Sequence, residues 1–176
     1  MSTNKEKICN IILVGTSIIY FFIMIDCLFL KKDYSLETLF SDRKINIIPL
    51  KTLAEYINYI CTNNTKKIIE AKNNLIGNVV IFFPLGIYLS LLKNIKHPLI
   101  SVIFFSFTAE IIQFTFNLGI FDIDDIILNT IGGAIGIIVI KILTYLIKNT
   151  YMIKFFIMST ALLVLAILLF DITINR

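Results

Sequence analysis

Five apolar runs, separated by short charged turns, decide what this chain can fold into. They cover residues 8–30, 74–92, 98–118, 123–147 and 153–170. At about 1.5 Å per helical residue, runs of roughly 20 residues match the ~30 Å hydrocarbon core of a bilayer. A backbone in hydrocarbon must satisfy its own hydrogen bonds, so each run is expected to be a helix. The sequence therefore predicts an all-α, multi-pass transmembrane helical bundle with about five spans.

The composition agrees with a membrane protein and excludes other classes. Residues of hydrophobic type make up 57% of the chain, which is not typical of a soluble domain. The net charge is +4, but the basic residues cluster between the apolar runs, which indicates topology and contact with lipid headgroups. No nucleic-acid partner is expected. Cys9, Cys27 and Cys61 are far apart, so we expect neither a disulfide framework nor a zinc site, and we expect no cofactor.

Residues 31–73 form the one long polar segment. Pro49 marks a turn within it, and Thr52 and Glu55 have the spacing of a helix capping box. Residues 53–61 follow with apolar side chains on one helical face. Two interpretations stay open: an amphipathic helix on the membrane surface, or a loop helix packed on the bundle.

Polar side chains are concentrated in an otherwise apolar stretch, residues 110–136. Such groups are costly at membrane depth unless they face protein or water, so they are functional candidates by default. Glu110 and Gln113 are three residues apart and share a helical face, as do Asp125 and Asn129, which are four apart. Asn78 of the second span is added to this group. The candidate ligand-binding residues are therefore Asn78, Glu110, Gln113, Asp122, Asp125 and Asn129.

Local signals predict details of the spans. Pro84 removes a backbone donor, so a freed carbonyl must find another partner. Asp122 or Asp124 is suited to cap the fourth span, because carboxylates are favoured at helix N-termini. Gly132 and Gly136 have the spacing that lets a second helix approach closely.

The lysines of the short loops predict the orientation. If five helices alternate, these lysines fall on one side: Lys5, Lys7, Lys93, Lys96, Lys148 and Lys154. The turn at residues 119–125 has no Lys or Arg and falls on the other side. The positive-inside rule then places the N-terminus in the cytoplasm, and the acidic turn and residues 31–73 outside. The eight basic residues of that outer loop argue for the opposite orientation.

Ordered motifs give the chain a family resemblance. They are NIIPLKT at residues 46–52, NVVIFFPLG at 78–86, EIIQ at 110–113 and FDIDDIILNTIGG at 121–133. Together they resemble the VanZ-like family over residues 8–147. The resemblance implies a four-helix membrane domain that includes the outer loop 31–73, with residues 148–176 as an additional C-terminal transmembrane helix. The family often has an Arg just before the FDxDD run, where this chain reads NLGI at 117–120, so no contact by that Arg is expected.

The resemblance implies an integral membrane protein of the cell envelope, with a role in low-level resistance to the glycopeptide teicoplanin in Gram-positive bacteria. On this hypothesis the polar candidates line an outward-facing pocket between the second, third and fourth spans. Its partners would be membrane lipids and a glycopeptide or a lipid-linked cell-wall precursor. Whether the protein forms an oligomer is left open.

Two alternatives stay open. The protein could be a membrane enzyme acting on a lipid-linked substrate, with Glu110, Asp122, Asp124 and Asp125 as acid, base or metal ligands. The sequence assigns no catalytic residue and no metal site of its own. Alternatively, the polar residues only bond the helices to one another, at about 0.6 kcal/mol each.

Overall fold

The computed structural model describes residues 4–29, 45–92, 95–147, 153 and 157. Its helices are α1 (Asn4–Phe29), α3 (Lys51–Cys61), α4 (Thr65–Leu91), α5 (Pro98–Thr115) and α6 (Ile123–Leu146). The all-α prediction is therefore confirmed. Most of the predicted fifth span, residues 153–170, lies outside the described residues.

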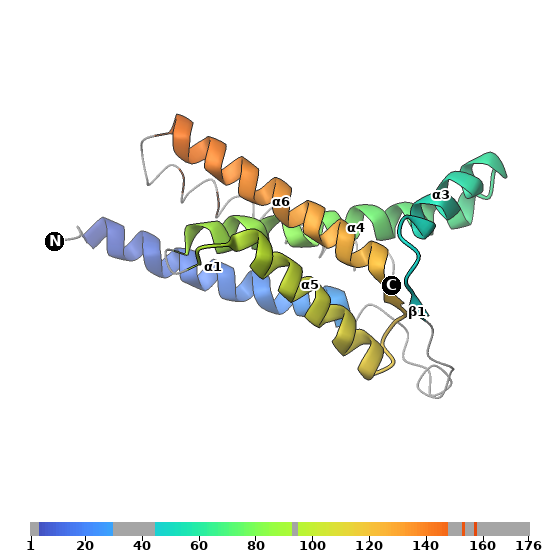
Figure 1. The fold of residues 1–176 in the computed structure, drawn as a ribbon. Helices are drawn as coiled ribbons and strands as arrows, with labels where there is room; N and C mark the ends of the chain where they lie inside the picture. The colour runs from blue at the N-terminus through green and yellow to red at the C-terminus, as the bar shows by residue number, and fades with distance from the viewer. Residues whose placement is uncertain (1–3, 30–44, 93–94, 148–152, 154–156, 158–176) are drawn as a thin grey trace.

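The helices alternate in direction, so the connection from α5 to α6 and the start of α4 lie at one end of the bundle. α1 and α5 run one way and α4 and α6 run the other way (Figure 1). α4 and α6 share the largest contact, and their buried side chains, such as Phe82 and Ile140, join Val102 of α5 in one hydrophobic core. The ends of α1 and α5 and the starts of α4 and α6 therefore lie at the same end of the molecule.

Three of the described helices, α4, α5 and α6, are long and apolar enough to cross a membrane. α1 contributes a shorter apolar stretch, Leu13–Leu28. α5 begins at Pro98, as predicted, since proline suits a first helical turn. α4 begins at Thr65, nine residues before the predicted span, because Asn64 caps it by accepting a hydrogen bond from the backbone N–H of Lys67 at 3.3 Å.

Glycines let α6 touch the backbone of α4. A Cβ atom added to Gly132 would collide with the carbonyl group of Val79, and one added to Gly136 would collide with the carbonyl group of Phe83. Residues 132 and 136 lie one helical turn apart, as do residues 79 and 83, so the two helices meet along a continuous line. Tight helix packing is thus confirmed as the role of these glycines.

Tyr20 joins α1 to α4 beside the proline. Pro84 has no N–H to offer the carbonyl four residues before it. In the same turn, the buried Tyr20 hydroxyl donates a hydrogen bond to the Ile81 carbonyl, and the Tyr20 ring packs 5.7 Å from the ring of Tyr88. Tyr20 thus adds a donor to this turn of α4, although the carbonyl that Pro84 leaves without an N–H is that of the preceding residue, Val80.

Asn117 ends α5 and turns the chain back. It follows the helix with a left-handed φ of 57°, which asparagine tolerates better than most residues. The backbone N–H of Leu118 then bonds the carbonyl of Gln113 at 2.8 Å, which is the pattern of a Schellman motif. The connection from α5 to α6 is therefore short and tight.

One further element, a pair of two-residue strands, has no counterpart among the sequence-based predictions. β1 (Ile45–Asn46) and β2 (Phe121–Asp122) pair in parallel, with Ile45 opposite Phe121 and Asn46 opposite Asp122. This pairing holds the segment just before α3 against the start of α6. It positions the polar groups described next.

Candidate functional site

Asp122 begins α6 and caps it. Its backbone is extended, and its side chain accepts a hydrogen bond from the backbone N–H of Asp124 at 2.9 Å. This satisfies one of the free amides of the first turn and places negative charge at the positive end of the helix. Asp122 is thus the cap of α6, and Asp124 is free for another role.

Asp124 caps a different helix, α3. Its Oδ1 accepts the backbone N–H of Leu50 at 2.5 Å, and its Oδ2 accepts that of Thr52 at 2.7 Å. The side chain is only 4% exposed, and short bonds to a charged acceptor offset the cost of burying it. Leu50 stands in the left-handed region at φ 64°, a conformation that costs a leucine roughly 1–2 kcal/mol.

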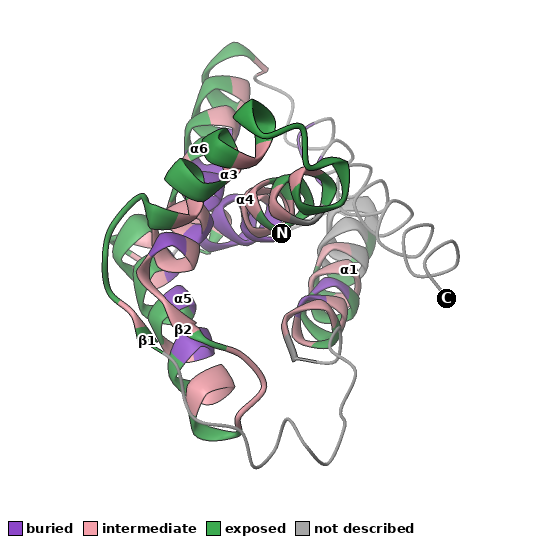
Figure 2. Cartoon of the chain, turned by 90° about the vertical axis from the view of Figure 1, so that its right-hand side faces the viewer, coloured by how far each residue is buried: buried purple, intermediate pink, exposed green. Residues whose placement is uncertain are grey.

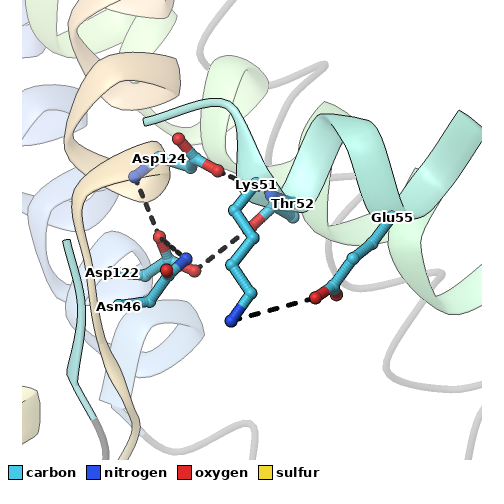
Figure 3. Close-up of polar contacts among 6 residues, drawn as sticks. All are labelled: Asn46, Lys51, Thr52, Glu55, Asp122 and Asp124. Carbon is cyan, nitrogen blue, oxygen red and sulfur yellow. Dashed lines mark hydrogen bonds and ion pairs between the residues drawn. The ribbon is translucent and has the colours of Figure 1, made fainter. Parts of the chain in front are cut away.

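The predicted capping box of Thr52 and Glu55 is wrong. Thr52 lies inside α3, and its hydroxyl donates to Oδ2 of Asp122 at 3.2 Å instead of capping its own helix (Figure 3). Glu55 points to Lys51, 4.0 Å away on the same helix. The carboxylate of Asp124 already occupies the N-terminus of α3, so no local cap is needed.

Asn46 completes this contact by donating from Nδ2 to Oδ1 of Asp122 at 3.0 Å. We call Asn46, Thr52, Asp122 and Asp124 the acidic clasp. It joins residues 46–52 to the start of α6 through two carboxylates and their donors (Figure 3). Two of its members, Asn46 and Asp122, are also paired in the β1–β2 ladder.

Glu110 and Gln113 of α5 form hydrogen bonds with α6 and α1, respectively. Glu110 is almost fully buried, and its Oε2 accepts the backbone N–H of Asp122 at 3.0 Å. Gln113 donates from Nε2 to the carbonyl of Leu28 at 2.8 Å, at the end of α1. The two residues share a face of α5, as predicted, and they bond two different neighbours.

Asp125 faces α4. Its Oδ1 accepts a hydrogen bond from Nδ2 of Asn78 at 2.6 Å and another from Nδ2 of Asn74 at 3.3 Å. Asp125 and Asn78 are half-buried, whereas Asn74 is exposed. Within the described part of the chain, the donors to this carboxylate are therefore neutral amides, and Oδ2 retains acceptor capacity.

Asn129 lies one turn deeper than Asp125, in contact with α5. It is 2% exposed and donates from Nδ2 to the hydroxyl of Ser106 at 3.0 Å. Its Oδ1 is buried and has no hydrogen-bond partner among the described residues. Such an orphaned acceptor costs about 1–3 kcal/mol, so this position has unused polar capacity inside the bundle.

The structure gathers the six predicted residues at one end of the bundle, in separate contacts. Asn78 meets Asp125, Glu110 meets the backbone of Asp122, and Gln113 and Asn129 bond other groups. The sequence reasoning missed four participants as site residues, namely Asn46, Thr52, Asn74 and Ser106, and it named Asp124 only as a possible cap and in the enzyme alternative. Helical spacing could have identified two of them, because Asn74 is four residues before Asn78 and Ser106 four before Glu110.

The arrangement bears on the enzyme alternative. Among the described residues, no three His, Cys, Asp or Glu side chains come together as ligands for one metal ion. The carboxylates of Asp122 and Asp124 accept hydrogen bonds through all four of their oxygens. They thus hold residues 46–52 against α6, whereas Oδ2 of Asp125 has capacity for a further donor.

Known proteins resemble the chain in sequence. The profile of the VanZ/LLP1 family matches residues 17–144. Protein VanZ of Enterococcus faecium is 31% identical over 130 residues, and the match covers 70% of each chain. No solved structure matches. The family match spans α4, α5, all but the last two residues of α6, and the whole acidic clasp.

Proposed function

The chain belongs to the VanZ/LLP1 family, and from this premise we propose that it contributes to low-level glycopeptide resistance, of the teicoplanin type, in a bacterial cell membrane. In this proposal the protein acts by binding an envelope ligand: a lipid, a lipid-linked cell-wall precursor or the drug itself. The ligand meets the polar end of the bundle. Support comes from the family and from the polar residues that three candidate spans contribute there.

One observation carries the proposal, the contact between Asn78 and Asp125. Two spans bring an amide and a carboxylate together at 2.6 Å, beside the exposed Asn74. The donors to Asp125 among the described residues are neutral, so its charge remains attractive to a donor group of a ligand. A few converging polar groups among apolar walls are what a ligand site needs.

The experiment that tests this proposal measures the susceptibility of cells to teicoplanin. Cells would express the wild type, Asp125→Asn or Glu55→Gln at matched membrane abundance. Glu55 is the control because it is an exposed carboxylate whose contact is with Lys51 of its own helix. We expect the wild type and Glu55→Gln to raise the inhibitory concentration and Asp125→Asn to lose that gain.

Two results would contradict the proposal. If the wild type gives no resistance, the role inferred from the family does not hold for this chain. If Asp125→Asn protects as well as the wild type, resistance does not depend on this carboxylate. An unchanged unfolding temperature in Asp125→Asn is needed to assign a loss of resistance to the site.

The proposal includes an orientation, with the N-terminus in the cytoplasm and the acidic clasp outside. It follows from the lysines of the short loops and from the turn at residues 119–125, which has none. Cys61 at the end of α3 is exposed and would face the medium. In a Cys9→Ser, Cys27→Ser background, a membrane-impermeant maleimide should label intact cells. Labelling only after lysis would reverse the orientation.

A further inference from the structure

We infer that one side of α3 and the loop before it bind the headgroup layer of the surrounding bilayer, with anionic phospholipid as the preferred partner. We call this surface the α3 face. It consists of Ile47, Ile48, Leu50, Leu53, Ile57 and Ile60. The inference does not depend on which ligand the polar end of the bundle takes.

The α3 face is apolar and uncovered in the described part of the chain. No residue of α3 is buried (Figure 2). Leu53, Ile57 and Ile60 recur at helical spacing, yet they are 41%, 55% and 47% exposed. An unpartnered apolar surface of this kind indicates an interaction site.

α3 is nevertheless fixed in place on another side. Its half-buried residues Tyr56 and Tyr59 are on the side that neighbours α4, and the ammonium group of Lys67 lies 5.2 Å from the centre of the Tyr59 ring. The acidic clasp holds its N-terminus. The bundle thus takes up one side of the helix and leaves the apolar side outward, which distinguishes α3 from an ordinary loop helix.

The depth of α3 follows from the length of α4. Its 27 residues span about 40 Å, roughly 10 Å more than a hydrocarbon core and close to the thickness of a bilayer with its headgroups. The polar residues of α4, which make it longer than the hydrocarbon core, lie at its N-terminal end, before Leu75. α3 lies beside that end (Figure 1). Its apolar face is therefore expected at headgroup depth, where amphipathic helices bind.

Exposed lysines on and near α3 favour an anionic lipid. Lys51 lies on α3, where it also pairs with Glu55 at 4.0 Å, and Lys66 and Lys72 lie on the adjoining start of α4. An apolar strip with lysines on the same and the neighbouring helix is complementary to anionic headgroups above acyl chains.

The chain has no tryptophan, so one introduced indole reports its own surroundings. Ile57→Trp probes the α3 face, and Asn58→Trp probes an exposed position on another side of the same helix. Each full-length variant would be reconstituted in phosphatidylcholine–phosphatidylglycerol vesicles, with and without brominated acyl chains. We expect the bromines to quench most of the emission of Ile57→Trp and to leave Asn58→Trp nearly unchanged.

Other results overturn the inference. Equal acrylamide quenching of both variants, without bromine quenching, would show that the face lies in water. An indole in Ile57→Trp that is shielded from acrylamide yet insensitive to bromine would show a protein partner, such as a second copy. Replacing phosphatidylglycerol by phosphatidylcholine should weaken the bromine quenching, and adding Lys66→Gln and Lys72→Gln should remove that difference. Quenching independent of phosphatidylglycerol would refute the anionic preference.

Discussion

Thr52 donates its backbone N–H to Oδ2 of Asp124, at 2.7 Å, across 72 residues of sequence. The first turn of α3 is therefore completed by the first turn of α6. A cap is ordinarily supplied by the residue that precedes its helix. Here the preceding residue, Leu50, instead donates its own N–H to the same carboxylate. The start of α3 thus has a fixed position relative to α6.

Replacing Asp124 should release α3. Asp124→Asn loses the negative charge and turns one acceptor into a donor that faces backbone N–H groups. We expect a loss of about 1–2 kcal/mol in unfolding free energy and faster amide hydrogen exchange at Leu50 and Thr52. Glu55→Gln, on the surface of the same helix, should change neither. If the two amides of the Asp124→Asn variant exchange at the wild-type rate, the capping role of Asp124 is contradicted.

Alanine at the glycines of α6 should push it away from α4. In Gly132→Ala and Gly136→Ala, the new methyl group meets a carbonyl group of α4 that cannot move alone. We expect each change to lower the unfolding free energy by roughly 1–3 kcal/mol in detergent. Gly77→Ala is the matched control, because a Cβ at that α4 position has no neighbour within 4 Å. Similar unfolding of all three variants would rule out close packing as the cause.

Asn78 and Asp125 should be energetically coupled. A double-mutant cycle of Asn78→Ala and Asp125→Ala isolates their interaction from the cost of each single change. Interhelical bonds in membranes average about 0.6 kcal/mol, and a charged acceptor raises the expectation to roughly 1–2 kcal/mol. Unfolding in detergent would measure it. Additive single effects would mean that the 2.6 Å contact contributes nothing to stability.

Removing one hydroxyl should loosen α1. Tyr20→Phe keeps the buried ring but leaves the Ile81 carbonyl without the donor that α1 supplies. We expect about 1 kcal/mol lower unfolding free energy. Tyr145→Phe, at an exposed position, serves as the control and should have no effect. Equal stability of the Tyr20→Phe variant and the wild type would show that the bond to α4 is dispensable.

The sequence predicts the helices of this bundle well because the membrane leaves few options. An apolar run such as residues 123–147 must be helical in hydrocarbon, and α6 covers Ile123–Leu146. The start of α4 was predicted too late, since its first turns are polar and resemble a loop. Apolar length identifies a span, but it does not show how far the helix continues into the headgroups or water.

Only some residues of the candidate site could be predicted from the sequence, and their hydrogen-bond partners could not. Glu110, Gln113, Asp125 and Asn129 stand out because polar groups are rare in apolar runs. Nothing local links Asp124 to Thr52, whereas the Thr52 and Glu55 spacing matches a local pattern that the structure does not use. Partners that are far apart in the sequence depend on how the helices pack. The spacing of residues along one sequence does not reveal this packing.

The clasp also sets an order of events during synthesis. α3 leaves the ribosome well before residue 124, and its cap arrives 72 residues later. At about 5–20 residues per second, that delay is roughly 4–14 seconds. For that interval the nascent residues 45–52 have neither their strand partner nor the cap of α3. Insertion of α6 is therefore the step that fixes this segment, and truncation before residue 122 should leave it without these contacts however well α4 and α5 have inserted.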